Sequence, residues 1–307
     1  MSMDLRDIDY FAVIADHKHL GRAAEALGLG QPALSISLRR LEKAAGAKLV
    51  NRTPKGVELT TVGSAVLAHV QRLRLARQDL AREVSDLAHG QAGHLRVGTS
   101  PAIANNLLPD ACSTLLKDAP GVTLNVSIAA STDALLLELR KGELDIVVIN
   151  VWNVPCEGIV HEPLWDDEFV VYASARHRLA RRRRVVLSDL VHERWASTAA
   201  SGFLAWNSLQ RALEERGLPA PQFALVSDSG ALNRRMVASL ELLGIAPRLS
   251  VEPEADNLGL KIISVRDMKW MRPVAAMHRK DGYLSPLAKR FIDILQAMAK
   301  TIAAKKG

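Results

Sequence analysis

The chain has 307 residues, 48% of them hydrophobic and 24% charged, with a formal net charge of +7. This composition excludes a chain that is disordered throughout, and the length predicts two or three domains. The positive charge is compatible with nucleic acid or an anionic membrane as a partner. The sequence starts without a basic segment followed by a long apolar run, and no run of about 18 apolar residues occurs. We therefore expect neither a signal peptide nor a membrane span, and a cytoplasmic location.

Three short helices are predicted in the first 60 residues. Apolar residues at helical spacing indicate a first helix from Leu5 to about Asp16 and a second from about Leu20 to Leu27. Gly28-Leu29-Gly30 forms a tight turn. A third helix begins at Gln31-Pro32, because proline suits the first helical turn, where its missing N–H has no partner to lose.

The third helix has one apolar face and one polar face. Leu34, Leu38 and Leu41 form the inner stripe. The outer face is predicted to carry Gln31, Ser35, Ser37, Arg39, Arg40 and Lys43. A short helix, a glycine turn and a polar-faced second helix predict a helix-turn-helix that enters the major groove. Gln and Ser can bond base edges, while Arg and Lys farther along neutralise phosphates.

A short β-hairpin, or wing, is predicted after these helices. Pro54-Lys55-Gly56 is a turn signal between two short extended pieces of the segment Leu49–Thr60. Arg52 and Lys55 would lie near a phosphate backbone. Residues 31–60 hold six Lys or Arg and two Asp or Glu. DNA binding is the favoured interpretation, and a solvated three-helix bundle with a charged face is the alternative.

The string GRAAEALGLGQPALSISLRRLEKAAGAKLVNRTPKGVELTTVG resembles the DNA-binding domain of LysR-type transcriptional regulators. The resemblance is highly specific here and extends more weakly over the whole chain. Ile36 stands where the family often has Arg or Gln, so the target sequence of relatives does not carry over. Together, pattern and resemblance give as DNA-binding candidates Gln31, Pro32, Ser35, Ile36, Arg39, Arg40, Arg52 and Lys55.

One long helix is predicted for Thr61–His89. Val66, Leu73, Leu80 and Leu87 repeat every seven residues along it. A heptad stripe on a helix roughly 40 Å long indicates a partner helix. Packing on its own domain is the alternative, but the other faces are mostly polar, so dimerisation is favoured. The resemblance agrees, because the family has a linker helix at this place.

Beyond residue 93 short apolar runs alternate with amphipathic helices, which predicts a βαβ architecture with a mainly parallel sheet. By resemblance, this part is an effector domain similar to periplasmic binding proteins, with two α/β lobes flanking a cleft. We expect the chain to cross between lobes near Glu162–Asp166 and Asp267–Met271. The predicted fold class is multidomain α+β. Its predicted parts are a winged helix-turn-helix at 1–60, a linker helix at 61–89 and an effector domain at 90–307, with lobe one at about 93–163 and 269–300 and lobe two at about 164–268.

Effector contacts are predicted where strands end and helices begin, because ligands lie there in open α/β sheets. This rule selects small hydroxyl residues and their neighbours: Thr99, Ser100, Ser131, Thr132, Thr198, Ser201, Phe203 and Asp228. Simple helix capping is the alternative for each of them. No Arg or Lys occupies these loops, so recognition would rest on hydroxyls and backbone dipoles. A small anionic effector is favoured, and a neutral polar one is left open.

The main functional hypothesis is a ligand-responsive transcription regulator that binds double-stranded DNA as a homodimer or homotetramer, with RNA polymerase kept open as a further partner. An enzyme or solute binder of the same fold is the second, but His161, His177, His192 and His278 are scattered, without triad or metal spacing. No catalytic residue, metal or cofactor is therefore predicted. A structural DNA-coating protein is the third.

Two other features stand apart from these sites. The run Arg181–Arg184 lies in the effector half on a predicted surface loop, and a solvated run is favoured over a contact with nucleic acid. Cys112 and Cys156 are the only cysteines. They form no metal-ligand cluster, and we expect buried structural thiols.

Overall fold

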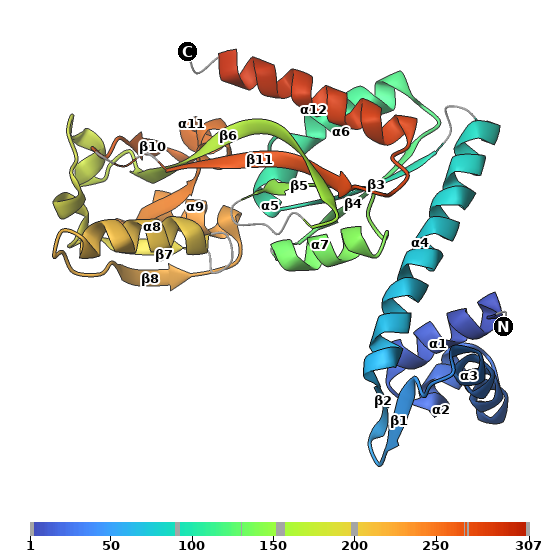
Figure 1. The fold of residues 1–307 in the computed structure, drawn as a ribbon. Coiled ribbons are helices and arrows are strands. Elements are labelled where there is room, and N and C mark those ends of the chain that lie inside the picture. Colours follow the sequence, from blue (N-terminus) through green and yellow to red (C-terminus); the bar gives the residue numbers. More distant parts are fainter. Residues whose placement is uncertain are drawn as a thin grey trace. The chain divides into compact units, whose positions relative to one another are not determined.

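The computed structural model describes residues 3–89, 93–129, 131–151, 157–197, 202–266, 268 and 270–304. The chain divides into two compact units, residues 1–85 and 86–307, which Figure 1 draws as a ribbon. Within the described ranges, no helix is both long and apolar enough to cross a membrane. Cys112 is a partly buried free thiol, whereas Cys156 lies outside the described residues.

The N-terminal unit begins with three helices: α1 (Leu5–His17), α2 (Leu20–Ala26) and α3 (Gln31–Ala45). Their limits follow from local chemistry. Asp4 caps α1 by accepting from the Arg6 N–H, and α3 starts at Gln31 with a proline in its first turn, as predicted. Phe11, Ile14 and Leu34 are fully buried where the three helices meet.

The predicted wing is present as β1 (Val50–Thr53) and β2 (Gly56–Leu59), which pair antiparallel. Gly56 has a φ of +136°, and a Cβ there would stand 2.2 Å from the carbonyl oxygen of Lys18. Its neighbour Val57 donates its N–H to that same oxygen at 2.9 Å. The wing is thus seated against the chain that leaves α1, and only glycine permits this approach.

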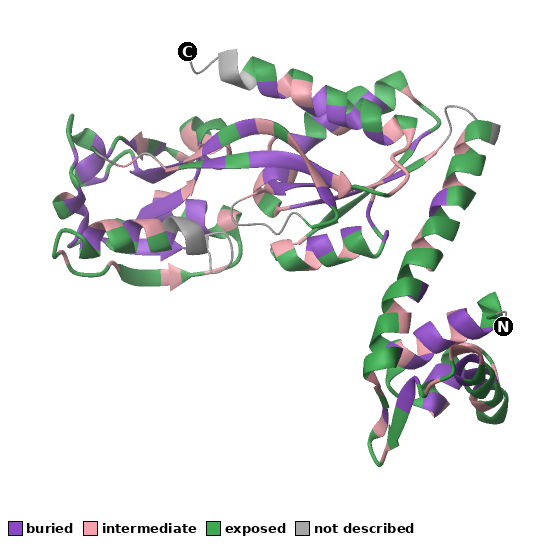
Figure 2. Cartoon of the chain, in the orientation of Figure 1, coloured by how far each residue is buried: buried purple, intermediate pink, exposed green. Residues whose placement is uncertain are grey.

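Helix α4 (Thr61–His89) follows directly, because the Thr60 hydroxyl accepts from the Gly63 N–H at 2.9 Å. Val66 packs partly on the core of its own unit, as packing on its own domain would require. Leu73, Leu80 and Leu87 do not: their exposed fractions are 51%, 61% and 80%. Figure 2 shows α4 exposed along most of its length.

The C-terminal unit is built on one nine-stranded sheet in the order β4-β3-β5-β11-β6-β9-β7-β8, with β10 also paired to β6. The strands are β3 (His94–Thr99), β4 (Thr123–Ile128), β5 (Ile146–Asn150), β6 (Ile159–Ser174), β7 (Arg194–Ser197), β8 (Gln222–Val226), β9 (Leu243–Pro247), β10 (Leu260–Ile263) and β11 (Trp270–Arg279). β4-β3-β5 and β9-β7-β8 are parallel trios. β6 and β11 pair antiparallel with each other and with their outer neighbours. The expectation of a mainly parallel sheet holds within each trio but is wrong for the whole, which is mixed.

Helices cover both faces of this sheet. With the first trio, hereafter lobe one, are α5 (Pro101–Ala104), α6 (Leu108–Asp118), α7 (Thr132–Arg140) and α12 (Pro286–Ala304). With the second trio, lobe two, are α8 (Gly202–Glu214), α9 (Gly230–Ser239), α10 (Arg248–Val251) and α11 (Ala255–Leu258). Lobe two also contains the 3₁₀ helices η1 (Arg178–Arg181), η2 (Leu187–Leu190) and η3 (Glu252–Glu254).

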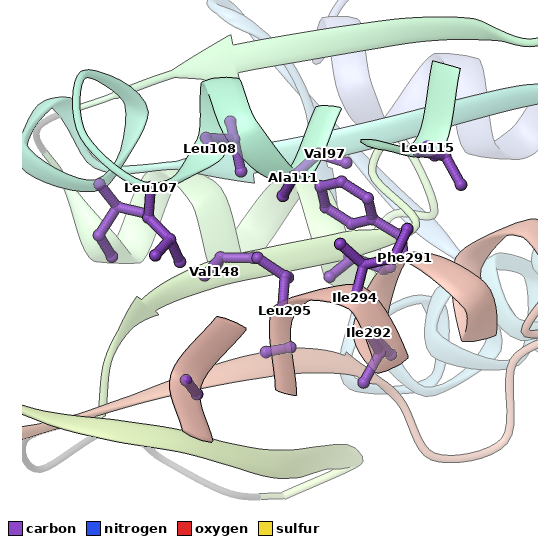
Figure 3. Packing of buried hydrophobic residues seen from close by; sticks show 14 of the residues in the cluster. Val97, Leu107, Leu108, Ala111, Leu115, Val148, Phe291, Ile292, Ile294 and Leu295 are labelled. Atoms are coloured by element: carbon purple, nitrogen blue, oxygen red, sulfur yellow. The ribbon is translucent and has the colours of Figure 1, made fainter. Parts of the chain in front are cut away.

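Each lobe has its own apolar core. In lobe one, Phe291 and Leu295 of α12 pack with Ala111 and Leu115 of α6 over Val97 and Val148, as Figure 3 shows. In lobe two, Trp195 is fully buried and meets Trp206 edge to face, with ring centroids 5.0 Å apart. Separate apolar packing in each lobe, with two strands joining the lobes, is the arrangement expected of a two-lobed unit.

Candidate functional site

The exposed face of α3 carries most of the predicted DNA-contacting residues. Gln31, Pro32, Ile36 and Arg39 are exposed and Ser35 is half-buried, while Leu34, Leu38 and Leu41 are buried on the opposite face. The N-terminal turns of the helix therefore present polar side chains and one exposed isoleucine. This is the end of a recognition helix that reaches base edges.

The prediction that Ser37 lies on this outer face is wrong. Ser37 is only 3% exposed, and its hydroxyl donates to Asp7 Oδ1 at 2.5 Å. Arg40 donates to the same carboxylate, through Nε to Oδ2 at 2.9 Å and through Nη2 to Oδ1 at 2.5 Å. The Arg40 guanidinium holds the pKa of Asp7 below its ordinary value. Asp7, on α1, thus fixes the position of α3.

Among the residues that the structure describes, the bases beside that face are exposed and are not paired with acids. Arg52 on β1 and Lys55 in the wing turn are exposed, as is Arg39. Within the described part of the chain, none of these three forms an ion pair, whereas the acid Glu42 is buried and accepts from Lys48 Nζ at 2.8 Å. Helix α3 and the wing therefore offer exposed positive charge to an anionic partner.

In the C-terminal unit, the strand register places the carboxyl ends of both trios at the junction between the lobes. β5 runs in the same direction as β6, since both are antiparallel to β11. β6 starts in lobe one and ends in lobe two, so β5, β3 and β4 all end toward lobe two. β9 is antiparallel to β6, so β9, β7 and β8 end toward lobe one. Figure 1 shows β6 and β11 running side by side across this junction.

Two buried polar atoms at the end of lobe one lack a hydrogen-bond partner among the described residues. They are the Ser100 hydroxyl, just after β3, and Asn150 Oδ1, the last residue of β5. Buried polar atoms are normally bonded, so an orphaned pair calls for an explanation. Thr99, by contrast, donates its hydroxyl to the Val148 carbonyl at 2.8 Å. The sequence reasoning missed Asn150, although the strand-end rule applied to the run from Leu144 to Val151 would have selected it.

Of the other predicted effector residues, Ser131 caps a helix, Thr132 and Asp228 lie near helix starts, and the remaining three lie outside the described residues or side chains. Ser131 is exposed and caps α7 by accepting from the Ala134 N–H at 3.3 Å, with Thr132 half-buried beside it. Asp228 is exposed in the turn before α9. Thr198, Ser201 and the side chain of Phe203 lie outside the described residues, as does Asp267, where one lobe crossing was expected to begin.

Charged side chains also lie at the junction. Arg248 directly follows the carboxyl end of β9 and donates to Glu168 at 2.8 Å, so a base does stand at a strand end that the sequence reasoning did not consider. Asn106 Nδ2 of lobe one lies 3.4 Å from Ser250 Oγ of lobe two. The lobes are therefore joined by polar contacts as well as by strands.

The histidines occupy separate structural positions. His177 caps η1 with Nδ1 and approaches Glu193 Oε2 through Nε2 at 3.3 Å, and burial lowers the pKa of His161. Within the described ranges, no group of three or more His, Cys, Asp or Glu is arranged to hold a metal ion.

Comparison with known proteins gives two family matches. Residues 5–64 match the model for bacterial regulatory helix-turn-helix proteins of the lysR family, and residues 88–300 match that for the LysR substrate binding domain. The SDS degradation transcriptional activation protein of a Pseudomonas species is 31% identical over 93% of this chain and 93% of its own. A full-length OxyR variant from Pseudomonas aeruginosa aligns with a TM-score of 0.68 at 25% identity, over 96% of this chain and 95% of its own. Full-length CbnR in complex with its target DNA aligns with a TM-score of 0.61 at 18% identity, over 96% of this chain and 99% of its own.

Proposed function

The chain belongs to the LysR family of bacterial helix-turn-helix regulators, and from this premise we propose how its residues carry out that role. It is a DNA-binding transcriptional regulator with an effector-binding domain, and the family is one of regulators rather than enzymes. We assign DNA binding to residues 1–60, dimerisation to 61–89 and effector binding to 90–307. We further propose that the chain has no enzymatic activity and acts in the cytoplasm, where the bacterial chromosome lies.

In this proposal α3 reads the major groove and the wing holds the backbone. Gln31, Pro32, Ser35 and Ile36 face base edges. Arg39, Arg52 and Lys55 neutralise phosphates. Arg40 remains within reach of DNA but acts chiefly by holding α3 on Asp7. The observation that carries the proposal is the set of exposed bases without acidic partners beside the exposed first turns of α3.

A second copy of the chain is the proposed partner of α4. Leu73, Leu80 and Leu87 lie seven residues apart and are exposed, which is the pattern of an unpartnered coiled-coil seam. Val66 begins the same stripe. Dimerisation through these residues would pair two recognition helices for two half-sites. A tetramer would need further contacts, made by the C-terminal units.

The effector site is proposed at the junction between the lobes. Ser100 and Asn150 supply buried polar atoms that a ligand could satisfy. Thr99 ends β3, Thr132 follows β4 and Asp228 follows β8, and we include all three in the proposed site. Ser131, Thr198, Ser201 and Phe203 complete the proposed set. Because Arg248 is already paired with Glu168, it is not held ready for an anionic ligand, so the proposed effector is a small polar molecule held mainly by hydrogen bonds, an anion being one form of it.

Genome-wide footprinting tests the regulatory role. A regulator protects discrete, two-fold symmetric sites, whereas a DNA-coating protein protects continuous stretches. Gln31→Ala is expected to change the preferred sequence, at a cost of about 1–3 kcal/mol at one base pair. Arg52→Ala is expected to weaken binding to all sequences and to lower the salt slope by about one unit. An unchanged slope in Arg52→Ala would refute the assignment of the wing.

A further inference from the structure

Lobe two carries a concentration of positive charge that the proposed DNA-binding and effector sites do not use. Residues 176–194 and 260–266 together hold nine arginines and lysines against two acids, a balance of +7, as large as the net charge of the whole chain. Surfaces of folded proteins normally intersperse both signs, because like charges at close range repel. This concentration therefore calls for a partner.

The fold brings these bases together from separate segments. Val185 forms a parallel bridge with Val265, and the Arg266 N–H donates to the Val185 carbonyl at 2.8 Å, so the segment that holds Arg266 lies alongside the segment that directly follows Arg184. β10, which contains Lys261, packs against η1. We define the arginine surface as the exposed residues Arg176, Arg181, Arg183, Arg184, Lys261 and Arg266.

The two acids of these segments are already occupied. Asp189 accepts from Arg182 at 2.7 Å, and Glu193 pairs with Arg178 and His177. Arg181, Arg183 and Arg184 have no ion pair within the described part of the chain. The sequence alone favours a solvated run, but it does not reveal that the neighbouring acids are consumed by other bases.

The surface is also held in place. Leu179 and Ala180 before the arginine run, and Val185 and Leu187 after it, are buried. Blocks of like charge on disordered tails are common, whereas here the backbone is anchored to the core of lobe two. Binding of a partner would therefore cost only the conformational entropy of the arginine and lysine side chains. Guanidinium groups also match phosphate oxygens in bidentate geometry.

We propose that the arginine surface is a second, sequence-independent contact for double-stranded DNA, made to the phosphate backbone outside the operator read by α3. It rests on the proposed DNA-binding role, which brings a polyanion to the protein. Arginine phosphate contacts add affinity and salt dependence without adding base preference.

The test compares full-length protein with the variant Arg181→Ala/Arg183→Ala/Arg184→Ala on two DNA fragments. One fragment is limited to the footprinted operator, and the other carries several helical turns of flanking duplex. On the long fragment the slope of log affinity against log salt is expected to fall by about one to three units, since each phosphate contact contributes about 0.9. On the short fragment the slope and the sequence preference are expected to stay unchanged.

A matched control removes the same net charge elsewhere, with Lys117→Ala/Arg140→Ala/Lys141→Ala on exposed positions of lobe one. It should behave as the unmodified chain on both fragments. Equal slopes for the arginine variant and the unmodified chain on the long fragment would overturn the proposal and leave an acidic protein or anionic lipid as the partner. An equal fall of the salt slope in the control variant would show that the effect comes from net charge alone, and this result would also overturn the proposal. Failure of the unmodified chain to bind the operator would instead count against the proposed function.

Discussion

The guanidinium of Arg272 donates to Asp167 Oδ2 through Nη2 at 2.9 Å, and both side chains are almost fully buried where β6 and β11 cross between the lobes. Nε adds a longer contact to the same oxygen at 3.3 Å. The Arg272 guanidinium carbon also lies 4.6 Å from the ring centroid of Phe169. A buried cation thus meets one carboxylate and one aromatic face at the point that joins the two lobes.

Removing one partner of the Asp167–Arg272 pair should destabilise the C-terminal unit. Asp167→Ala leaves a buried guanidinium without its carboxylate, and we expect a loss of about 3–5 kcal/mol in the free energy of unfolding of the C-terminal unit. The double variant Asp167→Leu/Arg272→Met should recover much of that loss, because no buried charge remains. Urea titration followed by tryptophan fluorescence measures both. Asp118→Ala, which breaks the exposed Arg290–Asp118 pair, serves as the control and should change little. A single variant as stable as this control would contradict the prediction.

The Asp7–Arg40 pair makes the seating of α3 acid-sensitive. The pKa of Asp7 lies below its ordinary value of 3.8, first because Arg40 donates to it. A carboxyl whose pKa is lower in the folded state stabilises that state above its unfolded pKa, and the contribution is lost as the pH falls through the folded value. Hydrogen exchange in α1 and α3 should therefore accelerate below about pH 4, beyond the intrinsic pH effect. In Asp7→Asn this extra acid dependence should disappear, with weaker protection already at neutral pH; retention of the full dependence would show that another group causes it.

The exposed leucines of α4 predict the oligomeric state. Leu73→Asp and Leu80→Asp place charges in an apolar seam at a cost of several kcal/mol. Dimers should dissociate, and specific DNA binding should fall with them. Gln78→Asp adds the same charge at an exposed polar position of the helix and should leave the dimer intact. Sedimentation velocity distinguishes these cases, and an unchanged oligomer in both leucine variants would count against the seam.

The effector response should depend on the hydroxyls at the strand ends. Ser100→Ala and Thr132→Val are expected to abolish or strongly reduce the change in DNA affinity caused by an inducer, while affinity without inducer stays the same. The inducer would first be identified by thermal-shift screening of small polar molecules. Thr114→Val removes a hydroxyl that only bonds the Asp110 carbonyl on α6 and is the matched control. Full induction in both site variants would show that the ligand binds elsewhere, or that these hydroxyls only cap their helices.

The features that sequence reasoning predicted correctly are those governed by near neighbours. The start of α3 at Gln31 follows from the adjacent proline, and the wing follows from Pro54-Lys55-Gly56. The features it missed depend on distant partners. Ser37 is buried because Asp7, thirty residues earlier, accepts its hydrogen bond. Arg248 gains importance only when the register turns the ends of two trios toward one junction, whereas Asn150 could have been selected by the strand-end rule. No local pattern encodes such a meeting.

The pairing of β6 with β11 also limits how the lobes can move. The ladder between them is unbroken in direction from Ile159–Arg279 to Phe169–Trp270, with one register shift at Val274/Ala275. Two free linkers would let the lobes swing apart as on a hinge, but a hydrogen-bonded ribbon resists opening and yields more readily to torsion. Binding of a molecule at the strand ends would then change the twist between the two lobes by a small amount, centred on the irregularity at Val274/Ala275. It would not open or close the space between the lobes.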